Sequence, residues 1–284
     1  MTELLFHVAG GRVFLALAAC LTILVVAGYF LRGDGVSRWF HFAMLTGIAG
    51  VLISGPALPR GVLPLWTVLA IIALAEGFLR ARDGRMLCGP ASAVLAVATC
   101  GAMLMELPYQ RLPAPATPPS IHVLGDSLSA GIGRESFTWP ERLEEITGFS
   151  VNSTARPGAR LADGPEQLRG IEDEDALVIV LLGGNDILLR RPRGEFERHL
   201  RALLEELTDG ERQTLMFELP VVAGYRPYGR VQRRLAREHN VPLIPGRVLA
   251  RVLSAHEGTS DGIHLTDNGH RQLADRVAGL FASD

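Results

Sequence analysis

The sequence predicts an α/β fold for the second half of the chain, with a mainly parallel sheet covered on both sides by helices, and an α-helical membrane region before it. Two observations lead to this prediction. Residues 1–107 are almost all apolar, and from residue 120 onward short apolar runs alternate with segments of helical periodicity. Strands that alternate with helices form βαβ units, whose strands are parallel. The chain therefore divides into a transmembrane helical region at 1–107, a proline-rich linker at 108–119 and an α/β domain at 120–284.

The α/β domain contains one strong strand signal and two strong helix signals. Residues 176–182 are an uninterrupted apolar run, which is typical of a central parallel strand buried on both faces. Residues 194–207 place apolar side chains at helical spacing, and Thr266 is a suitable N-cap for a closing amphipathic helix. The remaining strands are expected at 121–124, 149–153, 214–219 and 241–244, and the remaining helices at 139–147 and 228–239.

The first half of the chain contains four apolar stretches that approach the length of a transmembrane helix, about 20 residues. They lie at 13–31, 39–58, 62–79 and 86–106. A secretory signal peptide is the alternative for the first stretch, but three further apolar stretches follow it. Buried helices of a soluble protein are the other alternative, which the short arginine-bearing turns disfavour. We expect about four spans.

The arginines of this region predict its orientation. They are concentrated in the turns at 32–38 and 80–86, whereas the opposite side holds only Arg12 and Arg60. By the positive-inside rule the arginine-rich turns are cytoplasmic. Four spans then place everything after residue 107 outside. The sequence predicts a multi-pass protein of the cell (inner) membrane with an extracytoplasmic, periplasmic C-terminal domain.

Composition argues against several classes of function. The formal net charge is -2, the second half is acidic and no basic stripe appears on it, so nucleic-acid binding is not expected. Cys20, Cys88 and Cys100 all lie inside apolar runs, without the spacing of a zinc site or the even count of a disulfide framework. We expect no metal site and no disulfides. Glu76 lies near the end of its apolar stretch, and we expect it to pair with Arg80 one helical turn later.

Residues capable of chemistry follow the predicted strands. In parallel α/β sheets ligands bind at the carboxyl ends of the strands. Ser127 follows the first strand at the start of a helix, whose N-terminus favours negative charge that develops nearby. Gly158 follows the second strand and presents a bare backbone N–H, and Asn185 follows the strand at 176–182 after two glycines. Each of these alone is also explained as a turn or a helix cap.

A histidine near the end of the chain supplies the missing base. Asp261 lies three residues before His264, a spacing that allows both side chains to lie on one side of a single turn. Histidine is the usual base for a serine hydroxyl and needs an anionic partner to orient it. Nucleophile, base, orienting carboxylate and oxyanion donors then all fall at strand ends or helix starts. Together they form a complete set for acyl transfer.

Four short blocks resemble the signature blocks of the SGNH (GDSL) hydrolase family, in the same order. They are 125–129 (GDSLS), Gly158, 183–186 (GGND) and 261–264 (DGIH), and the resemblance covers 120–284. The residues around these blocks are most similar to the bacterial thioesterase and lysophospholipase branch. The resemblance implies a three-layer α/β/α sandwich like that of flavodoxin, without metal or organic cofactor.

The resemblance also implies a role for each residue. Ser127 is the nucleophile, His264 the general base and Asp261 the residue that orients the imidazole. The N–H groups of Ser127 and Gly158 and the side chain of Asn185 form the oxyanion hole. The expected activity is that of a membrane-anchored serine ester hydrolase, acting on a small-molecule or lipid-like ester through an acyl-serine. Two alternatives remain: an O-acetylesterase or O-acetyltransferase of a cell-envelope glycan, and a non-catalytic, membrane-bound ligand-binding remnant.

Overall fold

A computed structural model describes residues 11–31, 34–54, 56–83, 85–171, 173, 175–209 and 212–282. Packing contacts divide the chain into two units, which we describe separately. One unit spans Gly11–Gln110, and the main segment of the other begins at Arg111. The sequence predicts that the membrane region ends at residue 107. In the structure the last long helix of the first unit is followed by a short 3-10 turn, Leu107–Gln110, and the unit ends with this turn.

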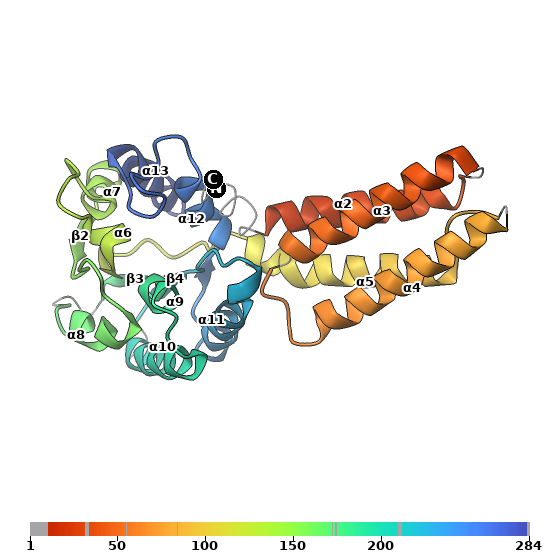
Figure 1. The fold of residues 1–284 in the computed structure, drawn as a ribbon. Helices are drawn as coiled ribbons and strands as arrows, with labels where there is room; N and C mark the ends of the chain where they lie inside the picture. The colour runs from red at the N-terminus through yellow and green to blue at the C-terminus, as the bar shows by residue number, and fades with distance from the viewer. Residues whose placement is uncertain are drawn as a thin grey trace. The chain divides into compact units, whose positions relative to one another are not determined.

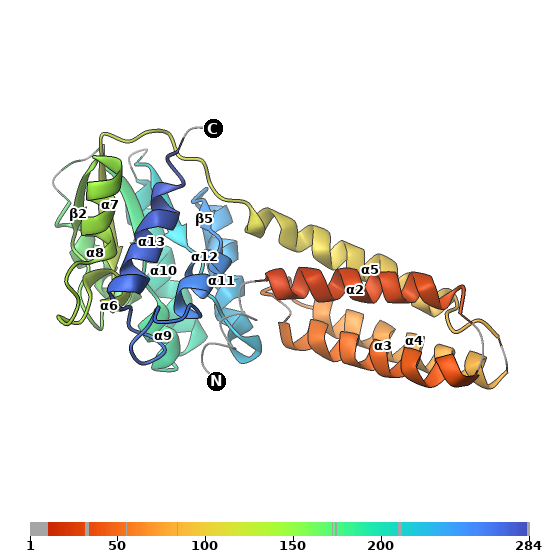
Figure 2. The same ribbon diagram turned by 90° about the horizontal axis from the view of Figure 1, so that it is seen from above.

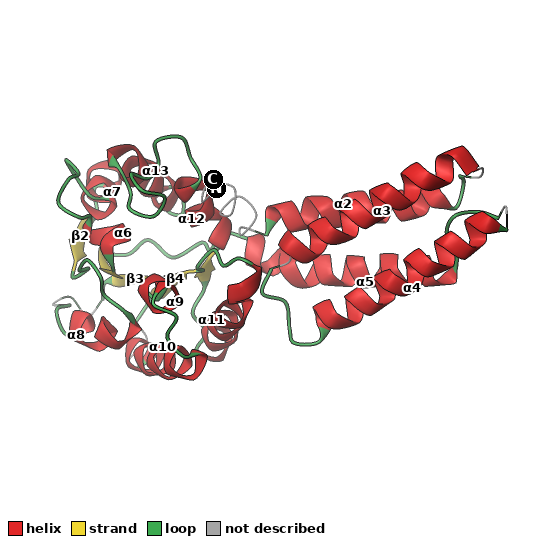
Figure 3. Ribbon diagram, viewed as in Figure 1, coloured by secondary structure: helices red, strands yellow, loops and turns green. Residues whose placement is uncertain are grey.

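The second unit is built on five parallel strands in the order β2-β1-β3-β4-β5. This is the order of doubly wound, flavodoxin-like sheets. The strands lie between two layers of helices, as Figures 1 and 3 show. They are β1 Ser120–Gly125, β2 Ser150–Ser153, β3 Leu177–Leu181, β4 Thr214–Phe217 and β5 Leu243–Ile244. The predicted parallel sheet covered on both sides is confirmed.

The alternation of side chains along β3 explains the two helical layers. Leu177, Ile179 and Leu181 pack into the core on one face of the sheet, and Val178 and Val180 into the core on the other. Successive residues of a strand point to opposite faces, so a strand that is apolar throughout needs cover on both. The first face is covered by α7 Trp139–Thr147, α12 Gly246–Leu253 and α13 Asp267–Ala278, and the second by α8 Gly164–Leu168, α10 Arg193–Thr208 and α11 Arg226–Glu238.

Most of the predicted elements of this unit form near their expected positions. Helix α7 has the predicted bounds, and Thr266 caps α13 by accepting a hydrogen bond from the N–H of Gly269 at 3.2 Å. Strand β5 is only two residues long, because Pro242 and Pro245 flank it and proline cannot donate to a sheet. Helix α12 was not predicted, although Val248, Leu249, Val252 and Leu253 follow a helical spacing and are buried.

In the part of the first unit that the structure describes, four α-helices lie alongside one another (Figure 2). They are α2 Arg12–Gly28, α3 Asp34–Ser54, α4 Val62–Arg82 and α5 Pro90–Glu106. Among the described residues, two helices are long and apolar enough to cross a membrane: Val62–Arg82 and Pro90–Gln110, with mean hydropathies of 2.1 and 1.6. Helix α2, Arg12–Gly28, and the segment Arg38–Ser54 of α3 are also apolar, but they are shorter than the 18 residues that this criterion requires. The core helix of a soluble protein meets the same test, so the four spans stay a prediction.

Glu76 has a second role besides its predicted pairing with Arg80. The Nε of Arg80 lies 3.4 Å from one carboxylate oxygen of Glu76. The other oxygen accepts the N–H groups of Ala91 and Ser92, at 3.0 and 3.3 Å. These donors belong to the first turn of α5, whose N–H groups have no partner inside the helix. Glu76 therefore caps the neighbouring helix.

Candidate active site

The serine turn directly follows the first strand of the sheet. After β1 ends at Gly125, Asp126 is the N-cap of a four-residue helix, α6 Ser127–Ala130. The carboxylate of Asp126 accepts the N–H of Leu128 at 2.9 Å. This capping bond fixes the backbone on both sides of Ser127, whose side chain is at the carboxyl edge of the sheet. Ser127 is only 7% exposed.

The glycine before this turn is required by packing. A Cβ atom on Gly125 would lie 2.4 Å from Oγ of Ser129. That oxygen is held in place because it accepts a hydrogen bond from the indole Nε1 of Trp139 at 3.2 Å. Trp139 is itself completely buried and packs edge-on against Phe217, with ring centroids 6.2 Å apart. This hydrogen bond joins α6, the helix that begins at Ser127, to α7.

Asp261 and His264 are joined as the sequence predicted. Nδ1 of His264 lies 2.7 Å from one carboxylate oxygen of Asp261. The other oxygen accepts the N–H groups of Ile263 and His264, at 3.0 and 2.8 Å. The hydrogen bond from the imidazole, with help from these two N–H groups, lowers the pKa of Asp261 to about 2. A carboxylate beside Nδ1 favours the tautomer whose proton is on Nδ1, which leaves Nε2 free to accept a proton.

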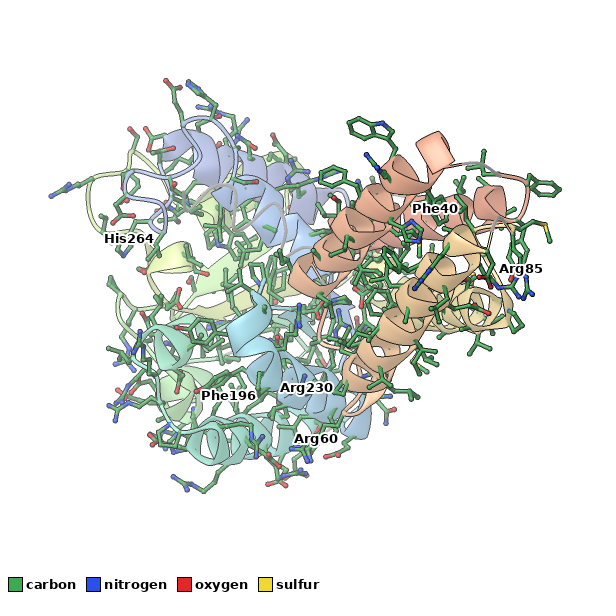
Figure 4. All side chains as sticks on the ribbon, turned by 45° about the vertical axis from the view of Figure 1, so that its right-hand side comes forward. Phe40, Arg60, Arg85, Phe196, Arg230 and His264 are labelled. Carbon is green, nitrogen blue, oxygen red and sulfur yellow. The ribbon has the colours of Figure 1, made fainter. Side chains whose placement is uncertain are left out.

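The loop that carries His264 precedes α13 and is partly open to solvent. The side chain of His264 is 31% exposed and that of Asp261 is 53% exposed; Figure 4 shows the imidazole in the loops at the edge of the unit. Backbone bonds close this loop: the N–H of Ser260 donates to the carbonyl of His264 at 2.9 Å, and that of Thr266 to the carbonyl of Gly258 at 3.2 Å.

The two further oxyanion candidates come from the loops after β2 and β3. Gly158 has a φ of 78°, and no atom lies within 4 Å of the position its Cβ would take, so its face is open. Asn185 lies in α9 Gly184–Leu188. Its Nδ2 donates to the carbonyl of Ala159 at 2.9 Å and lies 3.5 Å from the carboxylate of Asp126. Asn185 thereby connects the ends of three neighbouring strands.

Two carboxyl groups near the candidate site, those of Asp126 and Asp186, are buried. Burial raises the pKa of Asp126 to about 6, against the opposing effects of the Leu128 N–H and of His264. Burial also raises the pKa of Asp186, whose carboxylate accepts the N–H of Leu161 at 3.0 Å. Asp126 was part of the predicted motif, but the sequence assigned it no role.

The predicted residues are brought together in part. Asp261 contacts His264, and Asn185 contacts both the serine turn and the loop of Gly158. In the part of the chain that the structure describes, no hydrogen bond joins Ser127 to His264. Catalytic hydrogen bonds often shorten only when substrate binds. Within the same described ranges, no three His, Cys, Asp or Glu side chains gather in a way that would hold a metal ion.

Comparison with known proteins decides the family. Residues 123–272 match the model of the GDSL-like Lipase/Acylhydrolase family, over more than half of the chain. The chain belongs to this family. The prediction of an SGNH-type serine hydrolase of the esterase and lipase class is confirmed by this family membership.

The chain is also similar to individual proteins. The chain is 28% identical over 166 residues to "Thioesterase 1/protease 1/lysophospholipase L1" of Escherichia coli (strain K12), which covers 55% of this chain and 80% of that protein. Among solved structures it is similar to the psychrotrophic esterase EstA from Pseudoalteromonas sp., with a TM-score of 0.52 and 18% identity over 57% of this chain and 95% of that one. A structure of TesA matches with a TM-score of 0.49 and 23% identity, over 57% and 97% of the two chains. The first of these structural matches supports the predicted fold.

Proposed function

We propose that this chain is a membrane-anchored serine ester hydrolase that works through an acyl-serine intermediate, with Ser127 as nucleophile. The observation that carries the proposal is the 2.7 Å hydrogen bond between Nδ1 of His264 and the carboxylate of Asp261, which leaves Nε2 of the imidazole free to accept a proton. Membership of the GDSL-like family supports the same assignment of roles.

The proposed reaction has two halves. Oγ of Ser127 attacks the ester carbonyl while Nε2 of His264 takes its proton, and the tetrahedral intermediate places its negative oxygen near the N–H groups of Ser127 and Gly158 and the amide of Asn185. His264 then passes the proton to the departing alcohol or thiol, which leaves the acyl-serine. In the second half a water molecule gives its proton to His264 and attacks the acyl group, and the acid is released as Ser127 recovers its proton.

We propose that the substrate is a lipid-like ester, whose acyl group carries an apolar chain. Leu188 and Leu189 follow Asn185 closely and are 57% and 60% exposed. Exposed leucines beside the oxyanion candidate offer an apolar surface to the chain of an acyl group. The similarity to a protein named as a thioesterase and lysophospholipase supports this choice.

We propose further that the helical unit anchors the enzyme in the inner membrane with the catalytic unit on the periplasmic side. Only 22% and 28% of the most apolar windows of Val62–Arg82 and Pro90–Gln110 are buried inside the protein. Large apolar side chains such as Ile23, Phe30, Trp39 and Phe78 are more than 60% exposed. Lipid is the environment that such an outward apolar surface fits.

Two measurements test the activity. The full chain in detergent should hydrolyse p-nitrophenyl esters and react with a fluorophosphonate probe, and Ser127→Ala should abolish both. Ser150→Ala, at an exposed serine of β2, should change neither. A wild-type protein that neither turns over esters nor reacts with the probe would support a non-catalytic remnant. Release of acetate from envelope glycan, without hydrolysis of long-chain esters, would support the O-acetylesterase or O-acetyltransferase alternative instead.

Two further measurements test the anchoring. The chain should stay in the membrane fraction after an alkaline carbonate wash, and its release would contradict integral insertion. Reporters that are active only outside the cytoplasm should be active when fused after residues 60 and 110 and inactive after 33 and 83. The reverse pattern would overturn the proposed orientation.

A further inference from the structure

A buried glutamine holds the strand end from which the nucleophile projects. Gln167 lies in α8 and is 2% exposed. Its side-chain oxygen accepts the backbone N–H of Gly125 at 2.9 Å, and its side-chain nitrogen donates to the carbonyl of Gly125 at 2.9 Å. One side chain thus occupies both hydrogen-bonding groups of the last residue of β1, two positions before Ser127.

The position of this clamp follows from the sheet. The pairing of β1 with β2 ends at Val123 and Ser153, whereas its pairing with β3 continues to Gly125. On the β2 side the backbone of Gly125 therefore lacks a strand partner. A buried N–H or carbonyl needs a partner. Gln167 supplies the partner of the N–H of Gly125 and one of the two donors to its carbonyl.

The same glycine is also bonded to the loop of the proposed oxyanion donor. The carbonyl of Gly125 accepts the N–H of Arg156 at 3.1 Å, two residues before Gly158. The carbonyl thus receives two N–H groups, one from the Gly158 loop and one from Gln167. A shift of Gly125 would change the position of Ser127 relative to Gly158.

We propose that Gln167 is a positioning residue, which holds Ser127 and the N–H of Gly158 in register with each other. The proposal rests on the function proposed above. Gln167 touches neither of the reacting groups and acts through the backbone of Gly125. Because misplacement of reacting groups by about 1 Å costs on the order of 10²-fold in rate, loss of the clamp should appear in the rate of acylation.

A second glutamine provides a matched control inside the same molecule. Gln232 of α11 is 1% exposed and makes a similar double contact at the end of β4: it accepts the N–H of Leu219 at 2.9 Å and donates to the carbonyl of Phe217 at 2.8 Å. Its chemistry and burial match those of Gln167, but its strand end is not followed by the nucleophile. A purely structural clamp should behave alike at both places.

The experiment compares Gln167→Met with Gln232→Met in the full chain in detergent. Both substitutions leave a buried N–H without its partner and should lower the urea midpoint of unfolding by similar amounts. Only Gln167→Met should slow the reaction with a fluorophosphonate and lower kcat, each on the order of 10²-fold, with KM changed by less than about 3-fold. Equal rates for the two variants, or a change in KM alone, would overturn the proposal.

Gln167→Glu is a conservative variant that tests the proposal even where Gln167→Met does not fold. In Gln167→Glu the protonated carboxyl accepts and donates as the amide does, whereas the ionised carboxylate faces the carbonyl of Gly125. The acylation rate of Gln167→Glu relative to wild type should therefore fall as pH rises, and that of Gln232→Glu should not. A ratio independent of pH for Gln167→Glu, or the same fall for both variants, would refute the positioning role. A wild-type protein that does not react with the probe would refute the proposed function itself.

Discussion

Asp126 is a carboxyl group that destabilises the fold when it is ionised, and its replacement by asparagine tests this. Burial raises its pKa to about 6 from the ordinary 3.8. Between these two pH values Asp126 is therefore more protonated in the folded chain than in the unfolded chain. Stability contributed by this residue is highest at low pH, falls as pH rises from about 4 to about 6, and stays low above that.

The size of the effect follows from the two pKa values. Their difference of about 2 is worth about 3 kcal/mol, which is an upper estimate because the structure relaxes around the charge. Asp126→Asn keeps an oxygen that accepts the N–H of Leu128, so the cap of α6 survives. The hydrogen bond from Asn185 that the substitution removes is long, at 3.5 Å. The advantage of the variant over wild type in free energy of unfolding should grow by up to about 3 kcal/mol between about pH 4 and pH 7.

Trp139 is a suitable reporter for this measurement. It contacts Ser129 of α6, and replacing Trp39 and Trp66 by phenylalanine leaves it as the sole tryptophan. Urea unfolding of the full chain in detergent, followed by its fluorescence across the pH range, gives the free energy of unfolding. Asp175→Asn, at an exposed position, controls for the loss of one negative charge. An advantage that does not change with pH, or a wild type that is more stable than Asp126→Asn at pH 7, would refute the reasoning.

Two further substitutions address the loop of the base and the helix behind it. Asp261→Asn removes the charge that orients His264 and should lower kcat by about 10² to 10⁴-fold, with little loss of stability because Asp261 is half exposed; steady-state kinetics and urea unfolding measure the two effects, and an unchanged kcat would contradict the assigned role. Thr266→Ala removes the N-cap of α13 and should lower the free energy of unfolding by about 1 kcal/mol. Thr266→Ser keeps the hydroxyl and is its control, and equal stability of the two variants would show that the cap contributes nothing.

The regular elements could be predicted because their signals are local. The apolar side chains of α10 recur along one face, so periodicity assigns this helix. The run at 176–182 is short, uninterrupted and partly β-branched, and these features assign it to a strand. The candidate site could be predicted for a related reason. Its residues follow predicted strands, and parallel strands bring their carboxyl ends to one edge of the sheet.

The parts that the sequence could not predict depend on contacts between distant residues. Gln167 and Gly125 are 42 positions apart, and the partner of the side chain is a backbone group that any residue carries. The pairing of Trp139 with Ser129 has the same character. Helix α12 is only eight residues long and closely follows a two-residue strand, so its apolar pattern was too short to separate from its surroundings.

Ser127 and His264, the proposed nucleophile and base, are held in place in different ways. Ser127 projects from a turn that is buried and fixed on three sides, by the cap from Asp126, by Trp139 through Ser129 and by Gln167 through Gly125. His264 is held by Asp261 and by backbone bonds within its own loop, and both side chains are open to solvent. Local opening is easiest where little buried packing has to be broken. We therefore expect the loop of His264, rather than the turn of Ser127, to move when a hydrogen bond forms between these two residues.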